Sequence, residues 1–297
     1  MKKEKRISYE QYLELMRQEI ADRTGQRVEL HQVSKNNGIV LDALVIISKE
    51  SNISPTIYLN AYYQKFITDG IDVVAERIME LYEQSKTELS FDVSMLLNFD
   101  KVKHRIKMKL INYERNKELL KNTPHRKVLD LAVVFMIVLE TDDVCEFGTI
   151  RIHKGFLNAW NITEDSLYQI AKENMVNDFT TTPLDNIIHA VLEHEQTELL
   201  EEKVYLYVLT TQSKIHGAIG MLQTGLLDAF MKKYETEKLI ILPSSIHEVL
   251  LVPYEKIDTD INLHEMVQEV NATQLTEDEF LSNNIYSYDG KELKIFE

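Results

Sequence analysis

The sequence contains little cysteine, glycine and proline. It has one Cys, nine Gly and five Pro in 297 residues. The single cysteine, Cys145, excludes an intramolecular disulfide and a zinc site built from several cysteines, as is typical of a reducing compartment. A lone cysteine is usually a small buried side chain, so Cys145 is not a favoured nucleophile. Chains this poor in glycine and proline are neither fibrous nor disordered.

Long apolar runs are also absent. The longest, Leu131 to Leu139, is about half of the roughly 20 residues that span a bilayer. The basic N-terminus is followed by the polar sequence Ile7-Ser8-Tyr9-Glu10, whereas a signal peptide continues with an apolar stretch. We therefore expect a cytoplasmic protein without a membrane segment.

The glycine-rich motifs that hold nucleotide phosphates are missing. Neither Gly-x-x-x-x-Gly-Lys nor Gly-x-Gly-x-x-Gly after a strand occurs. Gly217, Gly220 and Gly225 lie in an expected helix over residues 217–236. Their first interpretation is close packing against a neighbour, and the second is phosphate binding at the helix N-terminus. The sequence predicts no cofactor.

Negative charge is concentrated in one half of the chain. The formal net charge is −15, with 21 Lys/Arg and 18 Asp/Glu in residues 1–126 against 12 and 30 in residues 127–297. An acidic surface repels nucleic acid and anionic lipid. We therefore expect a basic protein partner, and neither nucleic acid nor membrane.

The first half nevertheless contains a basic stretch. Lys103, Arg105, Lys107 and Lys109 alternate with apolar residues, which predicts a strand over residues 102–113 with the cations on one face. Binding of single-stranded nucleic acid also needs aromatic rings for stacking. Because Tyr113 is the only aromatic residue nearby, we expect this face to be solvated or to lie against acidic groups.

The pattern of helices and strands indicates an α+β fold. Ser8-x-x-Gln11 is a helix-capping pattern, and Asn36-Asn37-Gly38 between two apolar runs predicts a β-hairpin with a type I′ turn. Val128 to Leu139 predicts a central strand buried on both faces, and Pro183 to about Glu195 a helix. Tight turns between strands favour mostly antiparallel sheets with interleaved amphipathic helices.

The expected domain boundary lies near residues 122–126. It would separate an N-terminal lobe, residues 1–123, from an acidic α+β lobe, residues 124–297. One continuous domain is the alternative.

A metal site is not predicted. His189 and His194 are five residues apart, so a helix separates them by about 140°. His189 and Glu193 have the spacing of ligands on one face, but no third ligand is visible. They remain weak candidates on a polar helix face.

One short segment contains every residue type of a hydrolytic triad: Ser244, Ser245, His247 and Glu248. On a strand, however, His247 and Glu248 would point to opposite faces, and triads are assembled from distant segments. A Pro-Ser-Ser turn whose hydroxyls satisfy backbone groups is the first interpretation, and a catalytic site is the second.

Three further candidates stand at the entry to the expected central strand. Asp130 needs a partner if it is buried, and Arg126 or His125 would serve. We interpret this group as structural first and as a ligand-binding cluster second. Asn60, expected to cap a short helix that ends at Phe66, is the fourth candidate binding residue.

Four sequence blocks together resemble a family of uncharacterised bacterial proteins defined only as a domain of unknown function. They are Lys35–Gly38, Pro55–Asn60, Thr123–Arg126 with Asp130–Phe135, and Leu242–Val249. The resemblance implies a bacterial intracellular protein. It supplies no activity, cofactor or catalytic residue.

The leading hypothesis is a non-enzymatic binding or regulatory protein that acts through protein–protein contacts. One alternative is a hydrolase that uses the Ser244-His247-Glu248 region. The other is an acidic mimic of nucleic acid, which requires carboxylates along one face at the spacing of duplex phosphates.

Overall fold

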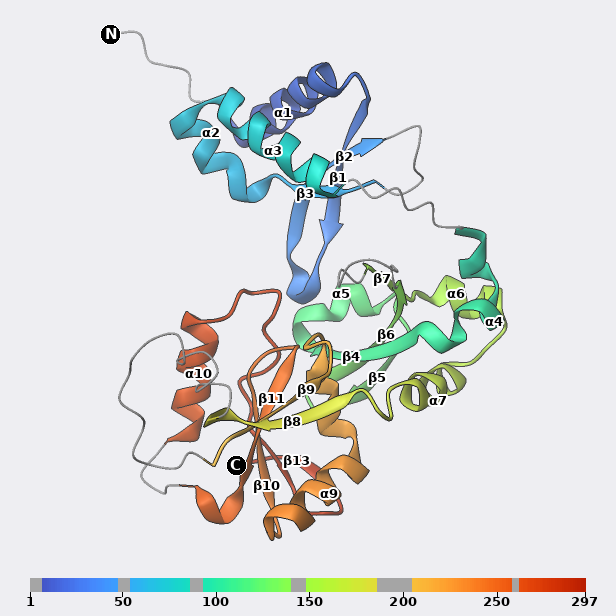
Figure 1. The fold of residues 1–297 in the computed structure, drawn as a ribbon, viewed down its shortest axis with the longest axis vertical. Helices are drawn as coiled ribbons and strands as arrows, with labels where there is room; N and C mark the ends of the chain where they lie inside the picture. The colour runs from blue at the N-terminus through green and yellow to red at the C-terminus, as the bar shows by residue number, and fades with distance from the viewer. Residues whose placement is uncertain (1–6, 48–53, 86–92, 140–147, 186–204, 258–261) are drawn as a thin grey trace. The chain divides into compact units, whose positions relative to one another are not determined.

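The chain forms two compact units, Met1–Ser94 and Met95–Glu297 (Figure 1). The computed structural model describes residues 7–47, 54–85, 93–139, 148–185, 205–257 and 262–297. The boundary expected at residues 122–126 lies inside the second unit, because β4 (Ile106–Asn112) pairs with β6 (Leu131–Leu139) across it. Antiparallel sheets with helices between their strands confirm the α+β class.

The first unit packs helices against one face of a three-stranded sheet (Figure 1). The capping box predicted at Ser8 is formed, with both reciprocal hydrogen bonds to Gln11, and Gly25 ends this helix in the left-handed conformation. Tyr12 is fully buried in the core and donates its hydroxyl to Leu59 O over 3.0 Å. The elements are α1 (Tyr9–Thr24), β1 (Arg27–Ser34), η1 (Asn36–Gly38), β2 (Val40–Ile47), β3 (Thr56–Tyr58), η2 (Asn60–Tyr62), α2 (Tyr63–Asp69) and α3 (Ile71–Ser85).

The predicted hairpin is present, but its turn is longer than a type I′ turn. β1 and β2 pair from Arg27↔Ile47 to Ser34↔Val40, so a five-residue loop joins them. Within this loop η1 forms one 3₁₀ turn, with positive φ at Asn37 and Gly38. Asn60 does not cap a helix: its Oδ1 accepts a hydrogen bond from the backbone N of Asp42 over 2.8 Å. Asn60 therefore fastens a loop to β2.

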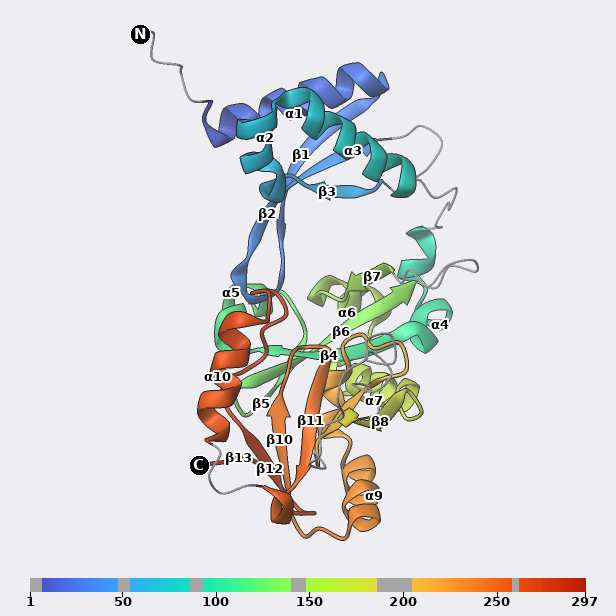
Figure 2. The same ribbon diagram turned by 60° about the vertical axis from the view of Figure 1, so that its left-hand side comes forward.

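The larger sheet of the second unit has the strand order β13-β12-β10-β11-β9-β8, with every neighbouring pair antiparallel (Figure 2). Pro183 ends β8, and the two residues that follow it, 184–185, are helical; the rest of the helix expected from Pro183 lies outside the described residues. The strands are β8 (Phe179–Pro183), β9 (Tyr207–Thr211), β10 (Leu239–Pro243), β11 (Glu248–Pro253), β12 (Tyr286–Tyr288) and β13 (Leu293–Ile295).

The smaller sheet is built around β6, whose residues 131–138 are all buried, as expected for a central strand. β6 pairs with β4 on one side, and with β5 (His125–Val128) and β7 (Gly148–Arg151) on the other. The long strand expected from Val128 is interrupted, because Leu129 and Asp130 form a turn between β5 and β6 with φ of 55° at Leu129.

Two expected elements of the second unit are altered. Lys103 and Arg105 lie in a 3₁₀ turn before β4 and not on the strand, while Lys107 pairs with Asp178 over 2.6 Å. The helix expected over residues 217–236 divides into η6 and α9. The helices are η3 (Val93–Leu97), α4 (Phe99–Val102), η4 (Lys103–Arg105), η5 (Glu114–Asn116), α5 (Lys117–Leu120), α6 (Lys154–Trp160), α7 (Glu164–Asn174), η6 (Gly217–Leu222), α9 (Thr224–Tyr234), η7 (Tyr254–Lys256) and α10 (Leu263–Thr273).

None of the helices in the described ranges has the length and apolar character that crossing a bilayer requires.

Candidate functional site

The turn between β10 and β11 contains the serines that we considered as nucleophiles. The hydroxyl of Ser244 donates to Glu248 Oε1 over 3.2 Å, and Ser245 Oγ accepts from the backbone N of His247 over 3.0 Å. The backbone N–H groups of both serines donate to Glu248 O. The structure therefore brings Ser244 to Glu248 rather than to His247, and the serines stabilise the turn.

His247 instead belongs to a group of four residues from distant segments, which we call the histidine cluster: Lys109, His216, His247 and Glu279. The two imidazole rings are stacked, with 5.3 Å between centroids and an interplanar angle of 18°. His247 Nδ1 accepts from the backbone N of His216 over 3.1 Å, and its Nε2 lies 3.9 Å from Glu279 Oε1. Lys109 Nζ lies 3.4 Å from His216 Nε2.

A close backbone approach places His216 in this cluster. His216 has φ of 56°, in the left-handed region that few residues with a side chain adopt. The next residue, Gly217, donates its N–H to His247 O over 2.8 Å. A Cβ at Gly217 would lie 2.5 Å from Thr210 Cα, whereas one at Gly225 would meet nothing within 4 Å. The packing expected of the glycines is thus confirmed at Gly217 and not at Gly225.

Burial keeps the imidazoles neutral. Together with the smaller effect of the nearby Lys109 charge, it lowers the pKa of His216 from 6.5 to about 3. Burial also lowers the pKa of His247, although the Glu279 carboxylate opposes the shift. Neutral His216 accepts a hydrogen bond from the Lys109 ammonium at Nε2, while its Nδ1 is buried and has no hydrogen-bond partner among the described residues. The cluster thus joins β4, η6 and the β10–β11 turn.

Asp130 does not contact the residues expected to accompany it. Its Oδ2 accepts from the Ser282 hydroxyl over 2.6 Å, and its Oδ1 from the Tyr286 hydroxyl over 2.8 Å. Burial and the charge of Asp130 raise the pKa of Tyr286. Arg126 instead donates to Asp165, and His125 Nδ1 lies 2.9 Å from Thr123 O. The group of His125, Arg126 and Asp130 is therefore not assembled, because the turn at residues 129–130 directs Asp130 toward the C-terminal segment.

The segment that receives Asp130, residues 275–286, is the feature that sequence reasoning missed. Outside β12 it contains no helix or strand, yet Leu281, Ser282 and Ile285 are almost fully buried. Asn112 at the end of β4 donates its side-chain amide to Leu281 O over 3.0 Å. The irregular backbone of this segment carries no period by which a sequence pattern reveals burial.

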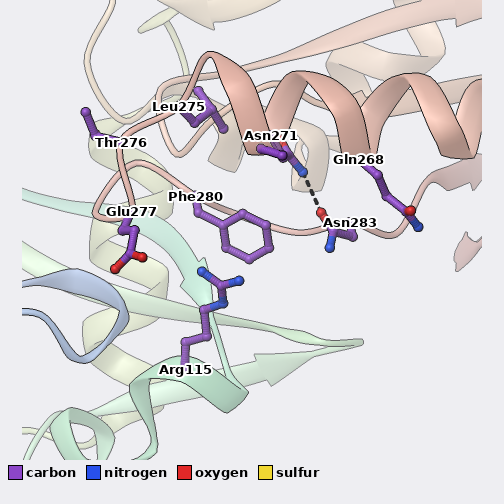
Figure 3. A pocket seen from close by; sticks show the side chains of 9 residues that line it. Arg115, Gln268, Asn271, Leu275, Thr276, Glu277, Phe280 and Asn283 are labelled. Atoms are coloured by element: carbon purple, nitrogen blue, oxygen red, sulfur yellow. Dashed lines mark hydrogen bonds between the residues drawn. The ribbon is translucent and has the colours of Figure 1, made fainter.

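A pocket of about 270 Å³ opens beside the same segment (Figure 3). Three elements supply its walls: η5, α10 and the loop that follows α10. Glu277 and Gln268 lie at opposite ends of the group of side chains (Figure 3). The lining residues are Arg115, Gln268, Asn271, Ala272, Leu275, Thr276, Glu277, Phe280 and Asn283.

Arg115 is the central polar group of this pocket. Its guanidinium carbon lies 3.7 Å from the centroid of the Phe280 ring, and Phe280 is 8% exposed (Figure 3). The backbone N of Arg115 donates to Asn112 Oδ1, which fixes the start of η5. Across the described ranges, Arg115 forms no ion pair. No sequence spacing connects Arg115 with Phe280, which lies 165 residues further along the chain.

The remaining candidates lie elsewhere. His189, Glu193 and Cys145 fall outside the residues that the structure describes. In the part of the chain that it does describe, no three His, Cys, Asp or Glu residues form a group able to hold a metal ion.

Comparison with known proteins gives one match. Residues 9–290 match the model described as a family of unknown function (DUF5688). No curated protein and no solved structure matches the chain. The match supports the resemblance to an uncharacterised family.

Proposed function

Because the chain belongs to DUF5688, a family of unknown function, we propose its function from the structure: it is a binding protein that acts through contact with a basic partner protein. The observation that carries this proposal is an acidic segment, residues 263–280, which consists of α10 and the loop after it. The segment has no Lys or Arg and five carboxylates, those of Glu265, Glu269, Glu277, Asp278 and Glu279.

The two carboxylates on α10 are not neutralised by any residue that the structure describes. Glu265 and Glu269 are exposed, and neither forms an ion pair within the described ranges. Exposed charge of one sign accelerates encounter with a partner of opposite charge, and salt screens the attraction. This uncompensated charge therefore favours a basic partner.

The geometry of the serine turn supports binding over hydrolysis. A serine nucleophile requires a base that accepts its proton. The Ser244 hydroxyl already donates to Glu248, and His247 Nδ1 is occupied by the backbone N–H of His216. A hydrolase that used His247 as the base for Ser244 would first have to break both hydrogen bonds.

The test is the association of the purified chain with partners from its native host, first at low salt. A recovered partner is then titrated against wild type, the E265Q/E269Q variant and the control E164Q/E173Q, which removes two exposed carboxylates from α7. We expect added salt to weaken binding, and E265Q/E269Q to weaken it about 3- to 10-fold. Recovery of nothing at low salt, or equal loss in both variants, would contradict the proposal.

Competition with a DNA duplex distinguishes a nucleic-acid mimic from the binding protein proposed here. A mimic occupies the nucleic-acid site of its partner, so a DNA duplex should displace it at concentrations near the affinity of the partner for DNA. A basic partner that binds α10 at another surface should hold both at once. Displacement would therefore favour the mimic over the present proposal.

A further inference from the structure

Arg115 and Arg126 of the second unit are both stacked on aromatic rings, but their guanidinium groups differ in what their edges contact. The guanidinium carbon of Arg126 lies 3.9 Å from the centroid of the Tyr168 ring, and its Nη2 donates to Asp165 Oδ1 over 2.5 Å. Arg115 lies equally close to Phe280. Within the described ranges, however, no carboxylate is paired with it.

We propose that the Arg115 pocket binds the carboxylate group of an organic ligand. A guanidinium whose face is covered by a ring keeps the donors on its edge, and these match the two oxygens of a carboxylate. Asp165 occupies the corresponding position at Arg126. This proposal goes beyond the function proposed above and does not depend on it.

The other walls of the pocket suit the remainder of such a ligand. Asn271 Nδ2 donates to both Ser282 O and Asn283 Oδ1 over 2.8 Å, which fixes the Asn283 amide (Figure 3). Asn283 Nδ2 makes no hydrogen bond within the described ranges and is available to a ligand oxygen. Ala272 and Leu275 add apolar surface. The pocket therefore offers donors at two points and an apolar wall.

Size and charge narrow the ligand class. The volume of about 270 Å³ is just below the range of roughly 300–1,000 Å³ for drug-sized ligands, so the ligand is about as large as one amino-acid residue. Among the described lining residues Arg115 is the sole cation, and Glu277 contributes a carboxylate. A single cation matches a monoanionic carboxylate better than a dianionic phosphate. The source is either a small free acid or the C-terminal carboxylate of a polypeptide.

The probes for calorimetry on the full chain are matched pairs. N-acetyl-leucine is compared with N-acetyl-leucinamide, and acetyl-Ala-Ala-Leu with its C-terminal amide; inorganic phosphate is the third class. We expect the free acids to bind and the amides to bind at least about 10-fold more weakly, because only the acids carry the charge-assisted bonds. Tighter binding of the tripeptide acid identifies a polypeptide terminus, and tighter binding of the smaller acid a free metabolite.

Two variants test the role of Arg115 itself. R115K keeps the positive charge but loses the two parallel N–H donors of the guanidinium. R126K makes the same change at the stacked arginine that is already paired with Asp165. We expect R115K to weaken binding of the free acids about 10- to 100-fold and R126K to leave it unchanged, with circular dichroism confirming that both variants fold. Equal binding of acids and amides, preference for phosphate, absence of binding at millimolar concentration, or equal effects of the two variants would overturn the proposal.

Discussion

The histidine cluster and the Arg115 pocket share the loop after α10 but differ in where their polar groups find partners. Glu279 of this loop faces His247, and the Phe280 ring stacks on the Arg115 guanidinium. In the cluster, the imidazoles contact each other, Lys109 and the backbone. In the pocket, the guanidinium edge has no carboxylate partner in the described ranges. The difference teaches that histidines, which are common in catalytic sites, can have their nitrogens occupied by neighbouring groups. A single arginine, by contrast, can keep its hydrogen-bond donors available to the ligand that we propose.

The largest effect is expected from Gly217→Ala, which disturbs the close backbone approach that forms the histidine cluster. The new Cβ would lie 2.5 Å from Thr210 Cα, so backbone must move. We expect a loss of about 3 kcal/mol of unfolding free energy, the upper range for overpacking. Urea denaturation followed by the fluorescence of Trp160, the single tryptophan and a residue of the second unit, measures it.

Gly225→Ala is the matched control, since a Cβ there meets nothing within 4 Å. Alanine is the better helix former, so this change should be neutral or stabilise α9 by up to about 1 kcal/mol. Equal losses at both glycines would show that the close approach at Gly217 does not hold the cluster together.

The next effect concerns Asp130, which anchors the segment that both regions use. Asp130→Asn replaces one of two acceptor oxygens by an amide donor, so either Ser282 or Tyr286 loses its hydrogen bond. We expect a loss of about 2 kcal/mol, measured in the same urea titration. Asp165→Asn removes an exposed ion-pair partner instead and should cost less than about 1 kcal/mol. A loss for D130N no larger than for D165N would contradict the anchoring role.

The third prediction uses pH to separate the buried imidazole from exposed ones. Unfolded His216 takes up a proton below its ordinary pKa of 6.5, whereas the folded residue stays neutral until about pH 3. The contribution of neutral His216 to the free energy of unfolding is therefore fully present above pH 6.5. It is lost as the pH falls, by up to about 2 kcal/mol between pH 7 and 5. His216→Asn, which tolerates the left-handed backbone, should remove this part of the slope.

His31→Asn on β1, where the side chain is 52% exposed, serves as the control for that measurement. The stability profiles of H31N and H216N are compared with that of wild type over the same range, pH 7 to 5. If H216N changes the slope no more than H31N does, the neutral state of the cluster does not contribute to stability.

The smallest effect is expected at the pocket. Arg115→Ala removes one cation–π contact, so we expect a change below about 1 kcal/mol. Arg126→Ala removes a comparable contact and an ion pair as well, and should cost slightly more. Thermal unfolding of the two variants compares them. A large loss in R115A alone would assign Arg115 to the fold rather than to a ligand.

Local signals predicted the local structure well. The Ser8 capping box, the hairpin around Asn36–Gly38 and most of the buried strand predicted over Val128–Leu139 depend on residues close in sequence. The α+β class followed from the tight turns between strands. Local signals do not reveal pairings between distant segments: β4 pairs with β6 across residues 122–126, and these residues lie within the second compact unit.

Neither candidate region was predictable as a whole from the sequence. The residue types of the segment Ser244–Glu248 drew attention to His247. The other members of the histidine cluster, however, come from β4, the loop before η6 and the loop after α10. Asp130 was expected to pair with Arg126 or His125 if it was buried, whereas its partners in the structure, Ser282 and Tyr286, lie far along the chain. Spacing rules apply within one helix or strand, and these contacts join different elements.

The buried irregular segment also determines when the second unit can fold. The hydrogen bond from Asn112 to Leu281 spans 169 residues, and that from Tyr286 to Asp130 spans 156. During synthesis the chain emerges from its N-terminus, so the polar groups at the ends of β4 and β6 gain these partners only after residues 281–286 have been made. The first unit closes its core within residues 7–82. We therefore expect a nascent chain whose first unit is complete still to expose the apolar strands of the second, a state that favours aggregation.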